Sequence, residues 1–397
     1  MTSMPKEVWI LTLCQVLFTA AISIDLTITS LAGQSLTLHP ELATIPFALL
    51  TVGGALIMPI LGWQIRYHGR RNALLTGCCI GVAGALISTI STLIPHFWGL
   101  CLGCLLVGAF QASAQFYRLA AGDLVRQELK QFAVSLVLAG GVIAAFLGPG
   151  LAVWSASLYP SSLFTGSYLT VSILILVSAL LLVCFYKTDG KPALAEASKA
   201  EWAGNYAALK KPVYLVATIN GVLITSVMML MMSSAPLAIV KAGLTMKEGA
   251  AVMQWHLVGM YAPSLVAGYT FRKLGAGMSL MIGISLTVLA ALVGMQGTQL
   301  ATFYWSLALL GVGWNLSFVT SSILLSLGND SSMRKAAQTA SETLRYLFSS
   351  AASLLSAAAL EYFGWHQLNI IMLPFLLVGL CVTGCWIIFS RTTPHAG

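Results

Sequence analysis

Residues 163–186 read LFTGSYLTVSILILVSALLLVCFY and contain no charged side chain. A helix needs about 20 mostly apolar residues to cross the hydrocarbon core of a membrane, and this stretch is long enough. Because backbone N–H and C=O groups find no water inside a bilayer, they must bond within the segment, which makes the segment helical. The stretch predicts one transmembrane helix.

Similar apolar stretches fill the rest of the 397-residue chain, separated mainly by short polar or basic loops. With 58% hydrophobic residues, 8% charged residues and a mean hydropathy of +0.88, the chain is not a soluble globular protein. Barrel strands would be about half as long, with alternating polarity. The sequence predicts an all-α membrane protein with twelve transmembrane helices, at residues 8–32, 43–65, 72–93, 97–120, 132–155, 163–186, 212–240, 250–271, 278–296, 302–327, 337–362 and 366–390.

The basic residues predict which loops are cytoplasmic, because loops rich in Lys and Arg stay on that side. With a cytoplasmic N-terminus, the outer loops hold only Lys241 and Lys247, and Arg345 falls within a span. We therefore expect a multi-pass protein of the inner (plasma) membrane with both termini cytoplasmic. The formal net charge of +8 then indicates contact with anionic membrane lipids rather than with nucleic acid.

The longest connection separates six predicted helices from six. Residues 187–211 read KTDGKPALAEASKAEWAGNYAALKK, and we expect a cytoplasmic linker with a short amphipathic helix on the membrane. It joins an N-terminal bundle, residues 1–186, to a C-terminal bundle, residues 212–397. Each half carries the pattern G-x-x-x-R-x-x-G after its second span: GWQIRYHG at 62–69 and GYTFRKLG at 268–275. Parallel six-helix repeats are typical of transporters whose two pseudo-symmetric halves rock around a midplane site.

The first of these loops resembles a known motif. Gly62, Gly69, Arg70 and Arg71, followed by Leu74, are similar to the loop between helices two and three of the major facilitator superfamily. The resemblance in layout covers the whole chain. It implies two six-helix bundles, a central cavity, alternating access usually powered by an ion gradient, and a monomer as the usual form.

Some positions depart from the superfamily pattern. Arg66 replaces the acidic residue common in that loop, and Cys104 stands where helix four often has an arginine. Gly148-Pro149 resembles the antiporter-type motif of helix five, although the flanking glycines are replaced by Ala144, Ala152 and Val153. The resemblance in fold survives these departures, whereas the interpretation as an antiporter is weakened.

Further segments resemble a bacterial branch of the superfamily. Members of the superfamily move drugs, sugars, vitamins, metal chelates and organic anions, so the fold does not choose the substrate. The segments are Tyr117-Arg118 through Asp123, Gly140-Gly141, Gln254-Trp255-His256, Ala262-Pro263-Ser264, Gly313-Trp314-Asn315 and Gly364-Trp365.

Ionisable residues inside predicted spans are candidates for proton coupling, because a charge in the bilayer costs roughly 2.5 to 3.5 kcal/mol. The candidates are Asp25, His256 and Glu342. Asp25 alternatively sits at a wet outer mouth or caps a helix segment, and His256 alternatively is a neutral imidazole bonded to a neighbouring helix.

Glu342 and Arg345 are three residues apart on one predicted helix face, within reach of an ion pair. The pair is either an inner gate or binding pair, or a structural pair that closes against the loop of Arg66, Arg70 and Arg71. The second alternative is favoured by the sequence.

Other candidate gating residues lie in the first half of the chain. Arg118 and Asp123 could pair, as gate residues or as structural ones, although a separation of five is not ideal for one helix face. Gly148 and Pro149 allow close helix approach and bending.

Polar and aromatic residues within the predicted spans are candidates for substrate binding. They suit a small, partly aromatic organic molecule better than a bare ion, but each amide could instead join two helices. The set is Gln15, Gln111, Gln115, Asn220, Trp255, Trp314 and Asn315.

Catalysis is not indicated, because the sequence has no phosphate-binding loop, no cofactor motif and no metal-type cluster of Cys and His. We predict a secondary transporter that moves a small organic solute and is coupled to protons, with drug-type efflux slightly favoured. Uptake of a vitamin or an iron chelate is the alternative, and a membrane receptor that does not transport is a minor one.

Overall fold

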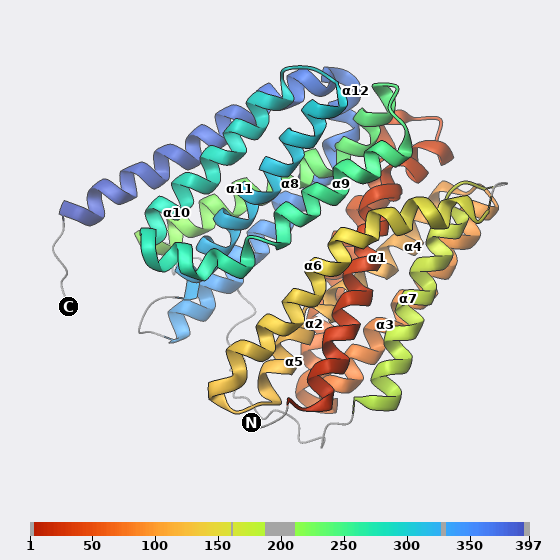
Figure 1. Cartoon of the computed structure of the whole chain (residues 1–397), viewed down its shortest axis with the longest axis horizontal. Helices are drawn as coiled ribbons and strands as arrows, with labels where there is room; N and C mark the ends of the chain where they lie inside the picture. The colour runs from red at the N-terminus through yellow and green to blue at the C-terminus, as the bar shows by residue number, and fades with distance from the viewer. Residues whose placement is uncertain (1–3, 160–161, 187–210, 327–330, 393–397) are drawn as a thin grey trace. The chain divides into compact units, whose positions relative to one another are not determined.

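The computed structural model describes residues 4–159, 162–186, 211–326 and 331–392, and every long element in these ranges is an α-helix (Figure 1). The described ranges contain no strand. The helices are α1 (Lys6–Leu36), the short 3-10 helix η1 (Pro40–Leu42), α2 (Ile45–His68), α3 (Arg70–Leu93), α4 (Phe97–Ala114), α5 (Tyr117–Asp123), α6 (Gln127–Ser157), α7 (Thr165–Phe185), α8 (Pro212–Lys241), α9 (Met246–Tyr261), α10 (Ser264–Gly294), α11 (Leu300–Ser326) and α12 (Ser331–Thr392).

Ten helical segments among the described residues are long and apolar enough to cross a membrane. The sequence predicts twelve. The difference arises because predicted span 250–271 is divided between α9 and the first turns of α10, while spans 337–362 and 366–390 both fall within the single helix α12.

Two of the long helices contain a residue with non-helical backbone angles. Gly275 in α10 has φ 74° and ψ 168°, and Gly364 in α12 has φ 73° and ψ 168°. Gly69, between α2 and α3, has φ 83° and ψ 160°. This region of backbone space is essentially restricted to glycine, so each glycine permits a sharp change of direction between helical residues on its two sides.

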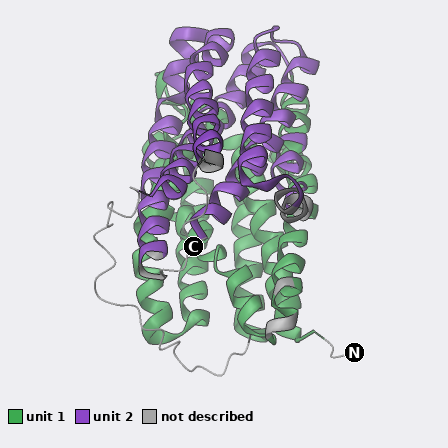
Figure 2. Cartoon of the chain, turned by 90° about the vertical axis from the view of Figure 1, so that its left-hand side faces the viewer, with its two compact units in different colours: residues 1–196, 245–254 green, residues 197–244, 255–397 purple. Residues whose placement is uncertain are grey.

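The chain divides into two compact units, coloured separately in Figure 2. Unit 1 comprises Met1–Glu196 and Thr245–Gln254, and unit 2 comprises Ala197–Leu244 and Trp255–Gly397. Most of the predicted linker, residues 187–210, lies outside the described residues, as does its expected amphipathic helix.

Small residues bring the helices of unit 1 into close contact. α1 lies beside α6 and α7, and α3 lies beside α4 (Figure 1). A Cβ added to Gly103 of α4 would lie 2.7 Å from the carbonyl oxygen of Gly84 and 2.2 Å from Ser88 Oγ, both on α3. Because no side chain fits there, the two helix backbones can pack directly against each other.

Unit 2 repeats this contact where α10 packs against α11. A Cβ added to Gly313 of α11 would lie 2.7 Å from the carbonyl oxygen of Gly283 and 2.5 Å from Thr287 Oγ1, both on α10. A glycine on one helix thus faces a glycine and, four residues later, a small hydroxyl residue on the other, in both units. The internal similarity of the sequence therefore extends to helix packing.

Candidate functional site

Asp25 lies in the second half of α1 and is buried inside unit 1. The residue is 2% exposed, and neither carboxylate oxygen has a hydrogen-bond partner among the described residues. Gln111 on α4 interacts with the carboxyl group but does not reach hydrogen-bond geometry. Since a charged carboxylate without donors is costly to bury, this group needs a proton or a donor from a bound solute.

Tyr168 and Cys104 form the other polar surroundings of Asp25. Tyr168 on α7 donates a hydrogen bond to Thr29 Oγ1 on α1 at 3.2 Å. Tyr168 and Cys104, on α4, lie within electrostatic range of Asp25, and both are 1% exposed. Neither side chain is a cation, so these neighbours do not supply an ion pair.

Gly148 brings α6 against α1 near Asp25. A Cβ added to Gly148 would lie 2.3 Å from Cβ of Ser23, two positions before Asp25. Pro149 follows inside α6 and has no backbone N–H to donate. Gly148, one of the predicted gating residues, thus packs against the helix that carries the buried carboxyl group.

Gln15 lies on the same interface, closer to the start of α1. Its Nε2 donates a hydrogen bond to Thr19 Oγ1 at 3.2 Å. A Cβ added to Gly141 of α6 would lie 3.6 Å from Gln15 Nε2. Gln15 is therefore in contact with α6, one face of which carries Gly141 and Gly148.

A second group of side chains lies in unit 2, where α11 meets α12. Trp314 stacks on Phe318, one helical turn later in α11, with ring centroids 4.7 Å apart and an interplanar angle of 14°. The guanidinium carbon of Arg345, on α12, is 4.6 Å from the centroid of the Phe318 ring. Arg345 also forms the predicted ion pair with Glu342, which confirms their shared helix face. We call these four residues the aromatic–arginine cluster.

His256 and Asn315 both bond to backbone atoms of neighbouring helices in unit 2. His256 is fully buried, and its Nδ1 donates to the carbonyl oxygen of Leu307 at 2.8 Å, while Nε2 has no partner among the described residues. Asn315 Nδ2 donates to the carbonyl oxygen of Met260 and to Ser264 Oγ, each at 2.5 Å. Asn315 therefore ties α11 to both sides of the break between α9 and α10.

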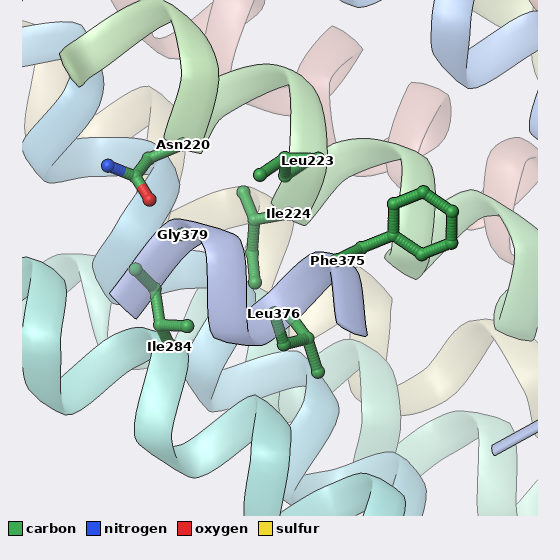
Figure 3. Close-up of a pocket in the computed structure, with 7 residues that line it drawn as sticks. All are labelled: Asn220, Leu223, Ile224, Ile284, Phe375, Leu376 and Gly379. Atoms are coloured by element: carbon green, nitrogen blue, oxygen red, sulfur yellow. The ribbon is translucent and has the colours of Figure 1, made fainter. Parts of the chain in front are cut away.

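Asn220 lines the pocket drawn in Figure 3, together with apolar residues of α8, α10 and α12. Its Nδ2 donates to the Val216 carbonyl oxygen and to Thr383 Oγ1, both at 3.0 Å. The space between these residues is about 160 Å³ even when adjoining open solvent is counted, whereas sites for organic ligands usually have at least about 300 Å³. In this structure the pocket is too small to be the substrate site.

The family model described as Major Facilitator Superfamily matches residues 8–353. The chain belongs to the Major Facilitator Superfamily. The resemblance inferred from its loop residues is therefore confirmed, and the chain is a multi-pass membrane transporter of solutes rather than an enzyme.

Two relatives of this transporter match it over most of its length. The riboflavin transporter RfnT of Brucella anthropi is 29% identical over 380 residues, covering 96% of this chain and 95% of the relative. The uncharacterized MFS-type transporter YddS of Bacillus subtilis is 27% identical, covering 95% of this chain and 90% of the relative.

Solved structures with the same fold include members that carry different solutes. The POT family transporter PepTSo superposes with a TM-score of 0.71 at 15% identity, covering 98% of each chain. A mutant of the nucleoside transporter NupG superposes with a TM-score of 0.73 at 13% identity, covering 96% of this chain and 99% of the other. At these identities the likeness establishes the fold and not the substrate.

The residues of the superfamily loop motif lie at the end of α2 and the start of α3 and are anchored within unit 1. Arg70 pairs with Asp123 at 2.6 Å, and Lys130 of α6 pairs with the same carboxylate at 3.4 Å. Arg71 donates to the carbonyl oxygens of Leu182 and Val183 at the end of α7, at 3.4 and 2.7 Å. The guanidinium of the third loop arginine, Arg66, lies 5.4 Å from the ring centroid of Tyr67.

Arg118, Gln115 and Trp255 are predicted site residues that the structure leaves exposed. Arg118 is exposed and does not form the suggested pair, because Asp123, five residues later, is directed to Arg70 and Lys130. Gln115 is exposed at the end of α4, and Trp255 is 50% exposed on α9. Gln115, in unit 1, is not among the neighbours of Asp25, and Trp255, in unit 2, is not part of the aromatic–arginine cluster.

Sequence reasoning missed several residues that complete these groups. Phe318 lies four positions after Trp314, a spacing that puts both on one helix face, so the stack was accessible from the sequence. Tyr168, Cys104 and Lys130 come from helices distant in sequence, and their positions depend on how α1, α3, α4, α6 and α7 pack.

Proposed function

We propose that this transporter takes up a vitamin of the riboflavin type, an organic solute with a planar heteroaromatic ring, across the inner membrane. The full-length relationship to RfnT carries the proposal. The stacked rings of Trp314 and Phe318 support it, because aromatic side chains suit planar rings. Uptake, the alternative considered from the sequence, is proposed in preference to export because a vitamin is a nutrient.

The proposal includes the transport cycle of alternating access between two six-helix bundles. In this proposed cycle the chain crosses the membrane twelve times. α10 contributes to two crossings, separated at Gly275, and α12 forms two crossings, separated at Gly364. The bundles are residues 1–186 and 212–397, joined by a cytoplasmic linker at 187–211. The distribution of Lys and Arg supports cytoplasmic termini. In this proposal the transporter functions as a monomer surrounded by lipid.

Proton coupling is proposed to reside at Asp25. The carboxyl group is buried without a hydrogen-bond partner among the described residues, so adding or removing a proton changes its energy strongly. Glu342 is less suited, because it is partly exposed and paired with Arg345. His256 is held by the Leu307 carbonyl oxygen, which is the structural alternative considered from the sequence.

The test is uptake of radiolabelled riboflavin by bacteria that cannot make the vitamin and express this chain. We expect saturable uptake above the vector control, growth at low external riboflavin, and loss of uptake when the proton gradient is collapsed. Absence of uptake, with the protein present in the membrane, would reject the riboflavin proposal. Uptake that persists after collapse of the gradient would reject proton coupling alone.

Export of a toxic organic compound is the second candidate. The close packing of Gly148 on Ser23 favours export, because Gly148, from the antiporter-type motif, lies where α6 contacts α1. Growth of the expressing cells in a panel of drugs tests this candidate. Resistance in the absence of riboflavin uptake would favour export, while unchanged sensitivity would exclude it for the compounds in the panel.

A further inference from the structure

We infer that the aromatic–arginine cluster binds uncharged planar heterocycles and discriminates against their phosphorylated forms, which deepens and rests on the proposed uptake of a riboflavin-type solute. The cluster consists of Trp314 and Phe318 on α11 with Glu342 and Arg345 on α12. All four side chains belong to unit 2.

The two rings form a platform for a third ring. Trp314 and Phe318 are nearly parallel, with 14° between their planes, and both are partly exposed. Their spacing of one helical turn fixes the pair on a single rigid helix. Stacking of a heterocyclic base on an aromatic side chain is favourable, so a planar ring gains more here than a flexible chain does.

Arg345 supplies hydrogen-bond donors beside this platform. A guanidinium has five N–H donors in a fixed plane, and Arg345 is positioned by the Phe318 ring and by one contact to Glu342. Its side chain is 17% exposed. The remaining donors suit the carbonyl oxygens and ring nitrogens on the edge of a heterocycle.

The indole of Trp314 adds a second donor. Its Nε1 is buried and has no hydrogen-bond partner among the described residues. An unpaired buried donor is unfavourable, and an acceptor on a bound ring would remove that cost. Trp314 thus supplies both this donor and one of the two rings of the platform.

The charge of the cluster determines which heterocycles fit. Glu342 neutralises Arg345 through the ion pair, so the four residues carry no net charge. A phosphate would be attracted by Arg345 and repelled by Glu342, and it would also lose its hydration on leaving water. The cluster therefore favours neutral rings, such as riboflavin or its bare ring system lumichrome, over flavin mononucleotide.

The experiment measures binding of riboflavin, lumichrome, flavin mononucleotide and ribitol to the purified full-length protein, by ligand fluorescence and by melting temperature. We expect riboflavin and lumichrome to bind with similar affinity, flavin mononucleotide to bind at least about tenfold more weakly, and ribitol not to bind. Tenfold is the effect of one moderate polar interaction.

Variants assign the binding to the cluster. Trp314→Ala should weaken lumichrome binding about tenfold or more, and Trp314→Phe, which keeps the ring but not the N–H, should weaken it less. Trp305→Ala is the matched control, because Trp305 lies on the same helix but is 66% exposed. Glu342→Gln should narrow or reverse the discrimination against flavin mononucleotide, a change that a purely structural role does not predict.

The outcomes separate this inference from the proposed function. Riboflavin uptake with unchanged lumichrome affinity in Trp314→Ala and Trp314→Phe would overturn the inference and leave the function standing. Lumichrome binding lost in Trp314→Ala, without riboflavin uptake, would support the inference and reject the function. Failure of the wild-type protein to bind any of the ring compounds, or equal affinity for flavin mononucleotide, would overturn the inference.

Discussion

Gly69 and Gly275 hold the same backbone conformation at the same position of the two sequence repeats, with φ 83° and ψ 160° at the first and φ 74° and ψ 168° at the second. Each is the last glycine of a G-x-x-x-R-x-x-G pattern. Residues with a Cβ avoid these angles. The two repeats therefore share a backbone geometry that requires glycine at this position.

The first prediction concerns this geometry. Gly69→Ala and Gly275→Ala should each lower the free energy of unfolding by about 1–3 kcal/mol, the usual cost of a side chain in this backbone region. Space is not the cause, because a Cβ at either position meets nothing within 4 Å. Melting temperatures of the purified variants measure the effect.

Gly62→Ala is the control for this prediction, because a Cβ added to Gly62 also meets nothing within 4 Å, but Gly62 lies inside helix α2 and has no positive φ. Alanine should be neutral or stabilising there. If all three variants melt alike, the explanation from backbone strain is wrong.

The second prediction concerns the contact of α6 with α1. Gly148→Ala should destabilise unit 1, since the new Cβ would lie 2.3 Å from Cβ of Ser23 and must push the helices apart. Overpacking of this kind costs typically about 1–3 kcal/mol. The double variant Gly148→Ala with Ser23→Gly should recover much of the loss, because it restores the space on the other helix.

Gly150→Ala, two positions along α6, provides the comparison for Gly148→Ala, since a Cβ at Gly150 meets nothing within 4 Å. Its melting temperature should stay close to that of the wild type. Equal losses at both glycines would show that alanine disturbs α6 itself rather than its contact with α1.

The third prediction concerns Asp25. Asp25→Asn should abolish stimulation of uptake by an inward proton gradient while leaving exchange of labelled for unlabelled solute across the membrane. The amide has the shape of the carboxyl group but cannot exchange a proton in this way. Uptake and exchange in vesicles containing the purified protein give both measurements.

Glu41→Gln serves as the control for Asp25→Asn, because Glu41 lies in the short helix η1, before α2 begins, and pairs with His39. Uptake by the Glu41→Gln variant should still be stimulated by the inward proton gradient. A response retained in Asp25→Asn would place proton coupling elsewhere.

The fourth prediction concerns the carboxylate shared by Arg70 and Lys130. Asp123→Asn should alter transport more than Lys130→Gln does, because Asp123 also pairs with Arg70, which is nearer and less exposed than Lys130. The effect on stability should stay below about 1 kcal/mol, since the Asp123 side chain is 50% exposed. Initial uptake rates and melting temperatures separate the two effects.

Exchanging the charges tests the pairing directly. Arg70→Asp combined with Asp123→Arg should transport better than either single variant, if the ion pair itself matters. Additive losses in the double variant would show that the two residues act independently.

Membrane insertion and helix positions were predictable because they depend on local composition. Apolar stretches such as 163–186 must satisfy their backbone hydrogen bonds internally, and α7, Thr165–Phe185, follows that stretch closely. The contact of Glu342 with Arg345 was likewise predictable, since helix spacing alone places them together. The same reasoning did not foresee that Asp123 turns toward Arg70, because that contact joins α5 to α3.

The sequence by itself determined that this chain is a helical membrane transporter with an internal repeat, because apolar length, basic loops and the glycine-arginine pattern are properties of short segments. Only the tertiary structure decided that Asp25 is buried without a partner among the described residues, that Gly148 faces Ser23, and that Arg345 lies over the ring of Phe318. These relationships depend on the rotation and separation of packed helices. Those are set by many contacts distributed over each unit and are not encoded in any one stretch of the chain.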